Sequence, residues 1–335
     1  MKSRTSLLFI LLGLLLIALF AIDMVVGKVA ISVGDLWGAL CGSDQLDPST
    51  LLIIRSIRLV KALVAIAAGA ALAVSGLQMQ TLFRNPLAGP FVLGISSGAS
   101  LGVALLLLGA PLLGLQASTL FSSFGLAGAA WIGSALVLLL IASVSRRIKD
   151  IMVILILGMM LSSGIDAVVQ ILQYLSNEGA LKSFVIWTMG SLGDVTTTQL
   201  WLLLLALCGG LILAVAAIKP LNLLLLGEQY ARTMGLSIRR ARLLIFLSTI
   251  LLAGTVTAFC GPVGFIGLAV PHLARLLFRQ ADHRVLLPAS ALTGSCVLLL
   301  CDIISKWFTL PINTITALMG IPIVVWVVIR HKNIA

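Results

Sequence analysis

Long apolar runs, separated by short polar stretches, are the main feature of the chain. Ten runs have plausible helix ends, and they cover residues 6–26, 62–82, 93–110, 119–144, 151–175, 199–218, 241–260, 263–279, 286–305 and 312–330. A helix needs roughly 20 mainly apolar residues to cross a hydrocarbon core of about 30 Å. Because the runs are too long for barrel strands, they predict an all-α polytopic membrane protein with about ten spanning helices.

The first apolar run follows a basic start, as the apolar core of a secretory signal peptide does. It continues to Val26 with only Asp23 interrupting it, and no clear small-x-small cleavage site follows. We therefore expect this run to be the first spanning helix.

Composition and charge placement agree with a membrane protein. Hydrophobic residues make up 60% of the chain and charged residues 10%, and the mean hydropathy is +1.19. The net charge of +11 would suit nucleic-acid binding, but the cations flank the apolar runs. With both termini in the cytoplasm, sixteen lysines and arginines fall at inner ends and loops and six fall outside. This bias follows the positive-inside rule, so we expect cytoplasmic termini and no nucleic-acid partner.

No motif for catalysis, metal binding or nucleotide binding is present in the sequence. The five cysteines have no metal-ligand spacing, and the three histidines are scattered. The chain also lacks a GxxxxGK[ST] phosphate loop and an HExxH metal motif. We therefore expect no catalytic residues, metal or cofactor, and any active transport would have to draw on a partner or an ion gradient.

Residues 227–242, "GEQYARTMGLSIRRAR", gather four arginines and a glutamate between two apolar runs. Glu228 and Arg232 have the i,i+4 spacing of a helical ion pair. Gly235 suits a left-handed C-terminal cap, and Ser237 suits the N-cap of the next helix. The stretch predicts a short capped helix and a tight turn, which favour a docking surface for a cytoplasmic partner over a plain topogenic loop.

Two segments between residues 84 and 102 carry unusual backbone signals. Gly94, Gly98 and Gly102 are four residues apart, so one helix face has a groove for close helix approach. We expect packing within the chain there, with a subunit contact or a pathway role as the alternative. The preceding "RNPLAGP", residues 84–90, cannot form a regular helix because of its prolines.

Several blocks in a fixed order carry a family resemblance. They are "AGAALAVSGLQMQTLFRNPLAGPFVLGISSGASLG" (68–102), "WTMGSL" (187–192), the stretch 227–242, "GPVGFIGLAVPHLARLL" (261–277) and "LPINTITALMGIP" (310–322). The chain resembles the FecCD-type permease subunits of type II ABC importers, which take up iron-siderophores, haem and cobalamin. The resemblance implies one permease domain, 1–335, a homodimer with a path on its twofold axis, two cytoplasmic ATPase subunits, an outer substrate-binding protein and a bacterial cytoplasmic membrane.

The resemblance assigns roles to both ends of the molecule. A segment at about 220–240 is implied to couple the permease to the ATPase, with contacts at Gly227, Glu228, Ala231, Arg232, Met234, Gly235, Leu236 and Arg239. Binding-protein docking is implied at Arg58, Lys61 and Lys306, where two lysines replace the more frequent arginines, and Asp302 is placed to orient Lys306. Snorkelling to lipid headgroups is the alternative for these cations. Asn85 and Leu87 match the turn that narrows the cytoplasmic exit.

Asp166, Gln170 and Gln173 are spaced i, i+4, i+7 in the fifth predicted helix, which lines the pathway in similar proteins. An ionisable group exposed to lipid costs about 2.5–3.5 kcal/mol on insertion scales, so such a group usually faces a cavity or a partner. We expect this polar face to line the conduit, with interhelical hydrogen bonding as the alternative.

No motif in the sequence identifies the substrate. An iron chelate, either a siderophore or haem, is the preferred expectation, and cobalamin is the close alternative. A gradient-driven carrier that uses Asp166 as a proton relay and a non-transporting scaffold remain as other classes.

Overall fold

The computed structural model describes residues 2–332 except 28, 42–46, 113–122, 146, 147 and 149. Every regular element among the described residues is a helix. Each predicted apolar run corresponds to one helical segment. The segments are α1 (Lys2–Val25), α3 with η1 and α4 (Pro48–Leu82), α5 with η3 (Ile95–Gly109), α7 (Ser123–Ser145), α8 (Ile151–Leu175), α10 (Thr197–Ala216), α13 with η4 and α14 (Ile238–Cys260), α15 (Ile266–Phe278), α16 (His283–Phe308) and α17 (Ile312–Lys332).

Seven of these segments are long and apolar enough to cross a membrane. Three more, Ile95–Gly109, Ile266–Phe278 and Ile312–Val327, are shorter apolar helices. The expected all-helical, polytopic class is therefore confirmed, and ten crossings stay a prediction.

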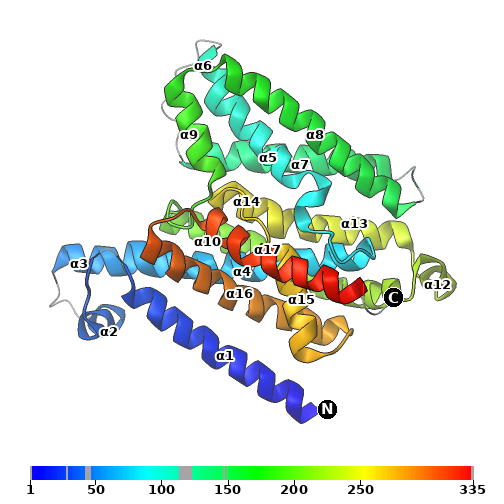
Figure 1. Ribbon diagram of the computed structural model, residues 1–335, viewed down its shortest axis with the longest axis horizontal. Coiled ribbons are helices and arrows are strands. Elements are labelled where there is room, and N and C mark those ends of the chain that lie inside the picture. Colours follow the sequence, from blue (N-terminus) through cyan, green and yellow to red (C-terminus); the bar gives the residue numbers. More distant parts are fainter. Residues whose placement is uncertain are drawn as a thin grey trace.

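Short helices join the long ones, and most were not expected from the sequence. They are α2 (Val33–Cys41), η2 (Pro90–Leu93), α6 (Ala110–Leu112), α9 (Glu178–Thr188), α11 (Ile218–Leu225) and α12 (Glu228–Thr233). Figure 1 places α2 and α3 at one end of the bundle, which we call the α2 end. The start of α1, the end of α17 and α12 lie toward the opposite end, the α12 end.

Helix α4 runs through the middle of the bundle, with α1 along one edge and α8 along the opposite edge (Figure 1). Its burial is possible because small residues let neighbouring backbones approach closely. A Cβ atom on Gly76 would lie 1.7 Å from the main-chain oxygen of Gly267 in α15, and one on Gly69 would lie 2.3 Å from that of Gly294 in α16. Glycine at these positions therefore sets the spacing of the core helices.

The glycine groove on α5 is filled by α7 of the same chain. A Cβ on Gly98 would lie 2.6 Å from the oxygen of Gly133, and one on Gly102 would lie 2.0 Å from that of Ala129. The expectation of packing within the chain is confirmed. The prediction of irregular backbone before α5 is also confirmed, because α4 ends at Leu82 and residues 85–89 are not helical.

Candidate functional site

At the α12 end, the chain makes two sharp turns around a short helix. Gly227 has φ +102° and caps the start of α12. At the other end, Gly235 has φ +86° and donates to the oxygen of Arg232 at 2.9 Å, while Leu236 donates to that of Ala231 at 2.9 Å. These two bonds form a Schellman C-cap. The predicted short helix and its left-handed glycine cap are confirmed.

Two local expectations for this segment are wrong. Glu228 pairs with Arg242 of α13, with 2.6 Å between the carboxylate and the guanidinium, and not with Arg232. Arg242 is only 5% exposed, so its charge requires a partner, whereas Arg232 is exposed and gains little from an ion pair in water. Ser237 stands at the N-cap of α13, but its side chain makes no capping hydrogen bond.

The exposed face of α12 and its turn differs in part from the predicted contact set. Arg232, Met234 and Arg239 are exposed, as a contact surface requires. Ala231 is fully buried and does not belong to this face, because it sits on the side of α12 that packs inward. Tyr230 on α12, which is 67% exposed, was missed.

The turn at residues 84–90 lies beside this segment. The Asn85 side chain accepts a hydrogen bond from the main-chain nitrogen of Leu87 at 2.9 Å, which holds the turn, and Leu87 is 43% exposed. The ring of His272 in α15 bonds to the oxygen of Pro86 at 2.8 Å. A Cβ on Gly227 would lie 3.5 Å from a guanidinium nitrogen of Arg84, so the predicted gate turn and coupling segment are neighbours.

A polar network, which runs from the exposed Asp282 to the buried His283 and Thr81, also ties α11 to α16 and α4, and sequence reasoning missed it. The amide of Asn222 donates to Asp282 at 2.6 Å, and its oxygen accepts from the main chain of His283 at 2.9 Å. In the His283 ring, Nδ1 bonds to the side-chain oxygen of Asn222 at 2.7 Å, and Nε2 bonds to the hydroxyl of Thr81 in α4 at 2.8 Å. The pKa of Asp282 lies below its usual value, because its carboxylate accepts hydrogen bonds from the main chain of Arg284 and from Asn222.

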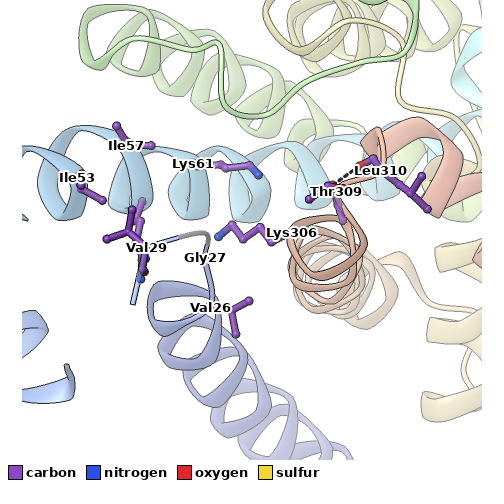
Figure 2. Close-up of a pocket in the computed structure, with 11 residues that line it drawn as sticks. Val26, Gly27, Val29, Ile53, Ile57, Lys61, Lys306, Thr309 and Leu310 are labelled. Atoms are coloured by element: carbon purple, nitrogen blue, oxygen red, sulfur yellow. Dashed lines mark hydrogen bonds between the residues drawn. The ribbon is translucent and has the colours of Figure 1, made fainter. Parts of the chain in front are cut away.

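At the α2 end, the three predicted docking cations converge on one pocket of about 550 Å³. Figure 2 shows Lys61 on α4 and Lys306 on α16 reaching toward the same space. Most of the wall is apolar, with Val26, Val29, Ile53, Ile57 and Leu310 among its residues. The three cations that were expected to act together therefore lie together in the structure.

All three cations have partners inside the subunit. Arg58 is 5% exposed and donates to the main-chain oxygens of Met24, Val25 and Val29, so its guanidinium is not free for a docking carboxylate in this state. The docking role that the resemblance implies for Arg58 therefore stays a prediction. The partners of Arg58 lie about 30 positions earlier in the chain, which no local pattern reveals.

The two lysines form an ion-pair cluster with two buried acids. Lys61 lies 2.9 Å from Asp302, and Lys306 lies 3.1 Å from Asp302 and 2.8 Å from Asp23. The expected orientation of Lys306 by Asp302 is confirmed. Asp23 at the end of α1 was missed as a partner.

The polar face of α8 lies on the outside of the single subunit. Asp166 and Gln170 are exposed and Gln173 is half-buried, whereas the neighbouring Ile165 and Val169 are buried. Among the described residues, the three polar side chains make no hydrogen bond to another element of the subunit. Interhelical hydrogen bonding within the chain therefore does not account for this face.

Long apolar helices define a polytopic membrane protein, with a short capped helix at one end and a cation-lined pocket at the other. The model of the FecCD transport family matches residues 15–330. The chain belongs to this family, and it is a permease of an ABC importer. The family expected from the sequence is confirmed.

Relatives of known name cover almost the whole chain. The hemin transport system permease protein HmuU of Yersinia pestis is 36% identical, over 99% of this chain and 97% of the relative. The vitamin B12 import system permease protein BtuC of Salmonella typhi is 35% identical, over 95% of each. A solved inward-facing structure of a metal-chelate type ABC transporter is 31% identical with a TM-score of 0.83, and the match covers 98% of this chain and 99% of that one.

Proposed function

We propose that the chain is the homodimeric permease of an importer that moves an iron chelate, either a siderophore or haem, across the bacterial cytoplasmic membrane. A substrate-binding protein delivers the chelate from outside, and a separate ATPase dimer supplies the energy. The α12 end faces the cytoplasm in this proposal, so both termini are cytoplasmic and the α2 end faces outward.

The observation that carries this proposal is the exposed face of the capped helix α12. Arg232 on α12, Met234 in the turn that follows it and Arg239 at the start of α13 are all exposed. The Schellman turn and the pair of Glu228 with Arg242 fasten α12 to the bundle. A rigid helix with exposed basic and apolar side chains suits a cleft in a partner protein. The helix would transmit movement because it is fixed to α13.

The remaining assignments follow from this orientation. Asn85 and Leu87 would narrow the inner exit beside α12, and Asp166, Gln170 and Gln173 on the outer face of α8 would line the path at the dimer axis. Lys61 and Lys306 would meet carboxylates of the binding protein.

The choice of substrate class rests on the relatives. The haem permease matches slightly more of the chain than the cobalamin permease does, at nearly equal identity. A cobalamin importer is therefore the close alternative within the same mechanism.

The test is reconstitution of the permease in vesicles with its ATPase and binding protein. We expect ATP-dependent accumulation of haem or an iron-siderophore, and no accumulation by the permease alone. The double variant Arg232→Ala with Arg239→Ala should keep the fold and lose most of the uptake while ATP hydrolysis continues. Arg284→Ala removes another exposed arginine at the same end and is the matched control.

Each part of the proposal has its own contradicting result. Accumulation by the permease alone that collapses on addition of an ionophore would make the chain a gradient-driven carrier. Accumulation of cobalamin but not of iron chelates would move the proposal to the alternative substrate.

A further inference from the structure

The ion-pair cluster at the α2 end places acids and cations on different sides of the pocket wall. Lys61 and Lys306 line the pocket, and their side chains are 21% and 10% exposed. The pocket lining among the described residues includes neither Asp23 nor Asp302, and both acids are fully buried. An anion that enters the pocket would therefore meet the two ammonium groups from the side opposite their internal partners.

The two acids are not equivalent. Asp302 is paired with both lysines. Within the described part of the chain, Lys306 is the only cation in ion-pair contact with Asp23, and it also donates to the main-chain oxygen of Asp23 at 3.0 Å. If Lys306 turned toward the pocket, Asp302 would keep Lys61, but Asp23 would lose its ion-pair partner.

This arrangement makes Asp23 the residue that resists movement of Lys306. A buried carboxylate without a cation is strongly unfavourable, so Lys306 leaves Asp23 only if it gains a comparable partner. The contact also joins distant elements, because Asp23 is in the last turn of α1 and Lys306 is in the last turns of α16.

We propose that Asp23 is a positioning residue that holds Lys306 at the pocket wall, so that docking exchanges this internal ion pair for one with a carboxylate of the substrate-binding protein. The inference rests on the proposed function, because it takes this pocket to be the docking site. Docking is then selective for a partner that brings a carboxylate to Lys306, and it loosens the end of α1 from α16.

The first experiment measures the freedom of the two lysines without any partner. The permease in nanodiscs is treated briefly with sulfosuccinimidyl acetate, and acetylation of each lysine is followed by mass spectrometry. Asp23→Asn should raise the rate at Lys306 several-fold and leave Lys61 unchanged. Asp302→Asn should raise the rate at Lys61 but not at Lys306, because Asp23 still holds Lys306.

The second experiment measures docking of the purified substrate-binding protein of the same transporter to these nanodiscs. Asp23→Asn should bind roughly fivefold more tightly than the wild type, since Lys306 no longer has to leave a carboxylate. A merely structural role would weaken docking or leave it unchanged. Asp35→Asn is the matched control, because Asp35 is half-buried on α2 at the same end and accepts a hydrogen bond from Ser32 instead of pairing with a lysine.

The outcomes separate this inference from the proposed function. Equal acetylation of Lys306 in the wild type and in Asp23→Asn would overturn the inference, and so would docking gains of the same size in Asp35→Asn. If Asp23→Asn does not fold, a rise at Lys306 in Asp302→Asn as large as that at Lys61 would overturn it. If the wild type never binds the substrate-binding protein, the docking assignment fails even when the acetylation pattern is as expected.

Discussion

Glu228 and Arg242 form an ion pair that fastens α12 to α13, with 2.6 Å between their charged groups. Arg242 belongs to a long helix of the bundle and Glu228 to the exposed segment, so the pair joins the candidate coupling surface to the membrane core. The side chain of Arg242 is 6% exposed and that of Glu228 is 22% exposed.

Glu228→Gln should therefore lower both stability and coupling. Breaking a fully buried ion pair costs about 3–5 kcal/mol, and partial exposure of Glu228 reduces the expected loss to about 1–3 kcal/mol. Thermal unfolding and limited proteolysis of the 227–242 segment measure the effect. Glu178→Gln removes an exposed glutamate at the start of α9 and should change neither. Equal stability of the two variants would show that the pair does not fasten α12.

The α16 N-cap gives a pH-dependent prediction. The folded-state pKa of Asp282 is below its ordinary value of 3.8, so its stabilisation is fully present above pH 3.8 and is lost as the pH falls through the folded-state pKa. Asp282→Ala should cost about 0.5–2 kcal/mol at pH 7, and the difference from the wild type should narrow in acid.

The matched variant for this measurement is Asp282→Asn, which keeps a capping oxygen but does not titrate. Its stability relative to Asp282→Ala should stay constant with pH. A stability difference between the wild type and Asp282→Ala that is as large well below pH 3.8 as at pH 7 would contradict the assignment.

The long helices could be predicted because each depends on a local pattern. The run 151–175 coincides with α8, and 199–218 lies within two residues of α10. The turn at Gly235 could also be predicted from the sequence, because a left-handed C-cap depends on the residue at that position. The short helices α2 and α9 could not be predicted in this way, since they lack both the length and the uniform apolar character that mark a spanning run.

The sites were predictable in their residue types but not in their pairings. Arg232 was the expected partner of Glu228 because it is four positions away, but Arg242 is buried and its charge has the greater need of a carboxylate. Asp23 was seen only as an interruption of the first apolar run, since its partner Lys306 is 283 positions later. Pairings of this kind depend on the packing of α1 against α16, which no local pattern contains.

Core spacing gives a prediction that does not depend on function. Gly76→Ala would place a Cβ 1.7 Å from the main-chain oxygen of Gly267, so α4 and α15 would have to separate. Overpacking of this kind typically costs about 1–3 kcal/mol, and a backbone atom cannot move aside as a side chain can, so we expect at least that loss. Thermal unfolding in detergent measures it.

Gly13→Ala is the control for the core variant, because no atom lies within 4 Å of the added Cβ on α1. It should unfold at nearly the same temperature as the wild type. Similar behaviour of both variants would mean that α4 and α15 do not approach each other as closely as described.

Substitutions of Asp166 test whether the outer face of α8 meets lipid or lines the path at the dimer axis. If this face meets lipid, the carboxylate is a liability of about 2.5–3.5 kcal/mol, and Asp166→Leu should stabilise the protein without loss of uptake. If it lines the path at the dimer axis, Asp166→Leu should impair uptake strongly, while Asp166→Asn keeps a polar surface and changes uptake mainly for charged chelates.

We expect strong impairment by Asp166→Leu, because Gln170 and Gln173 extend the polar face by two further turns. Three polar side chains on one side of a helix suit a water-filled path better than lipid. Vesicle uptake and thermal unfolding, measured together, separate the two cases. Ser163→Ala is the control on α8, since its exposed hydroxyl already bonds to the oxygen of Met159.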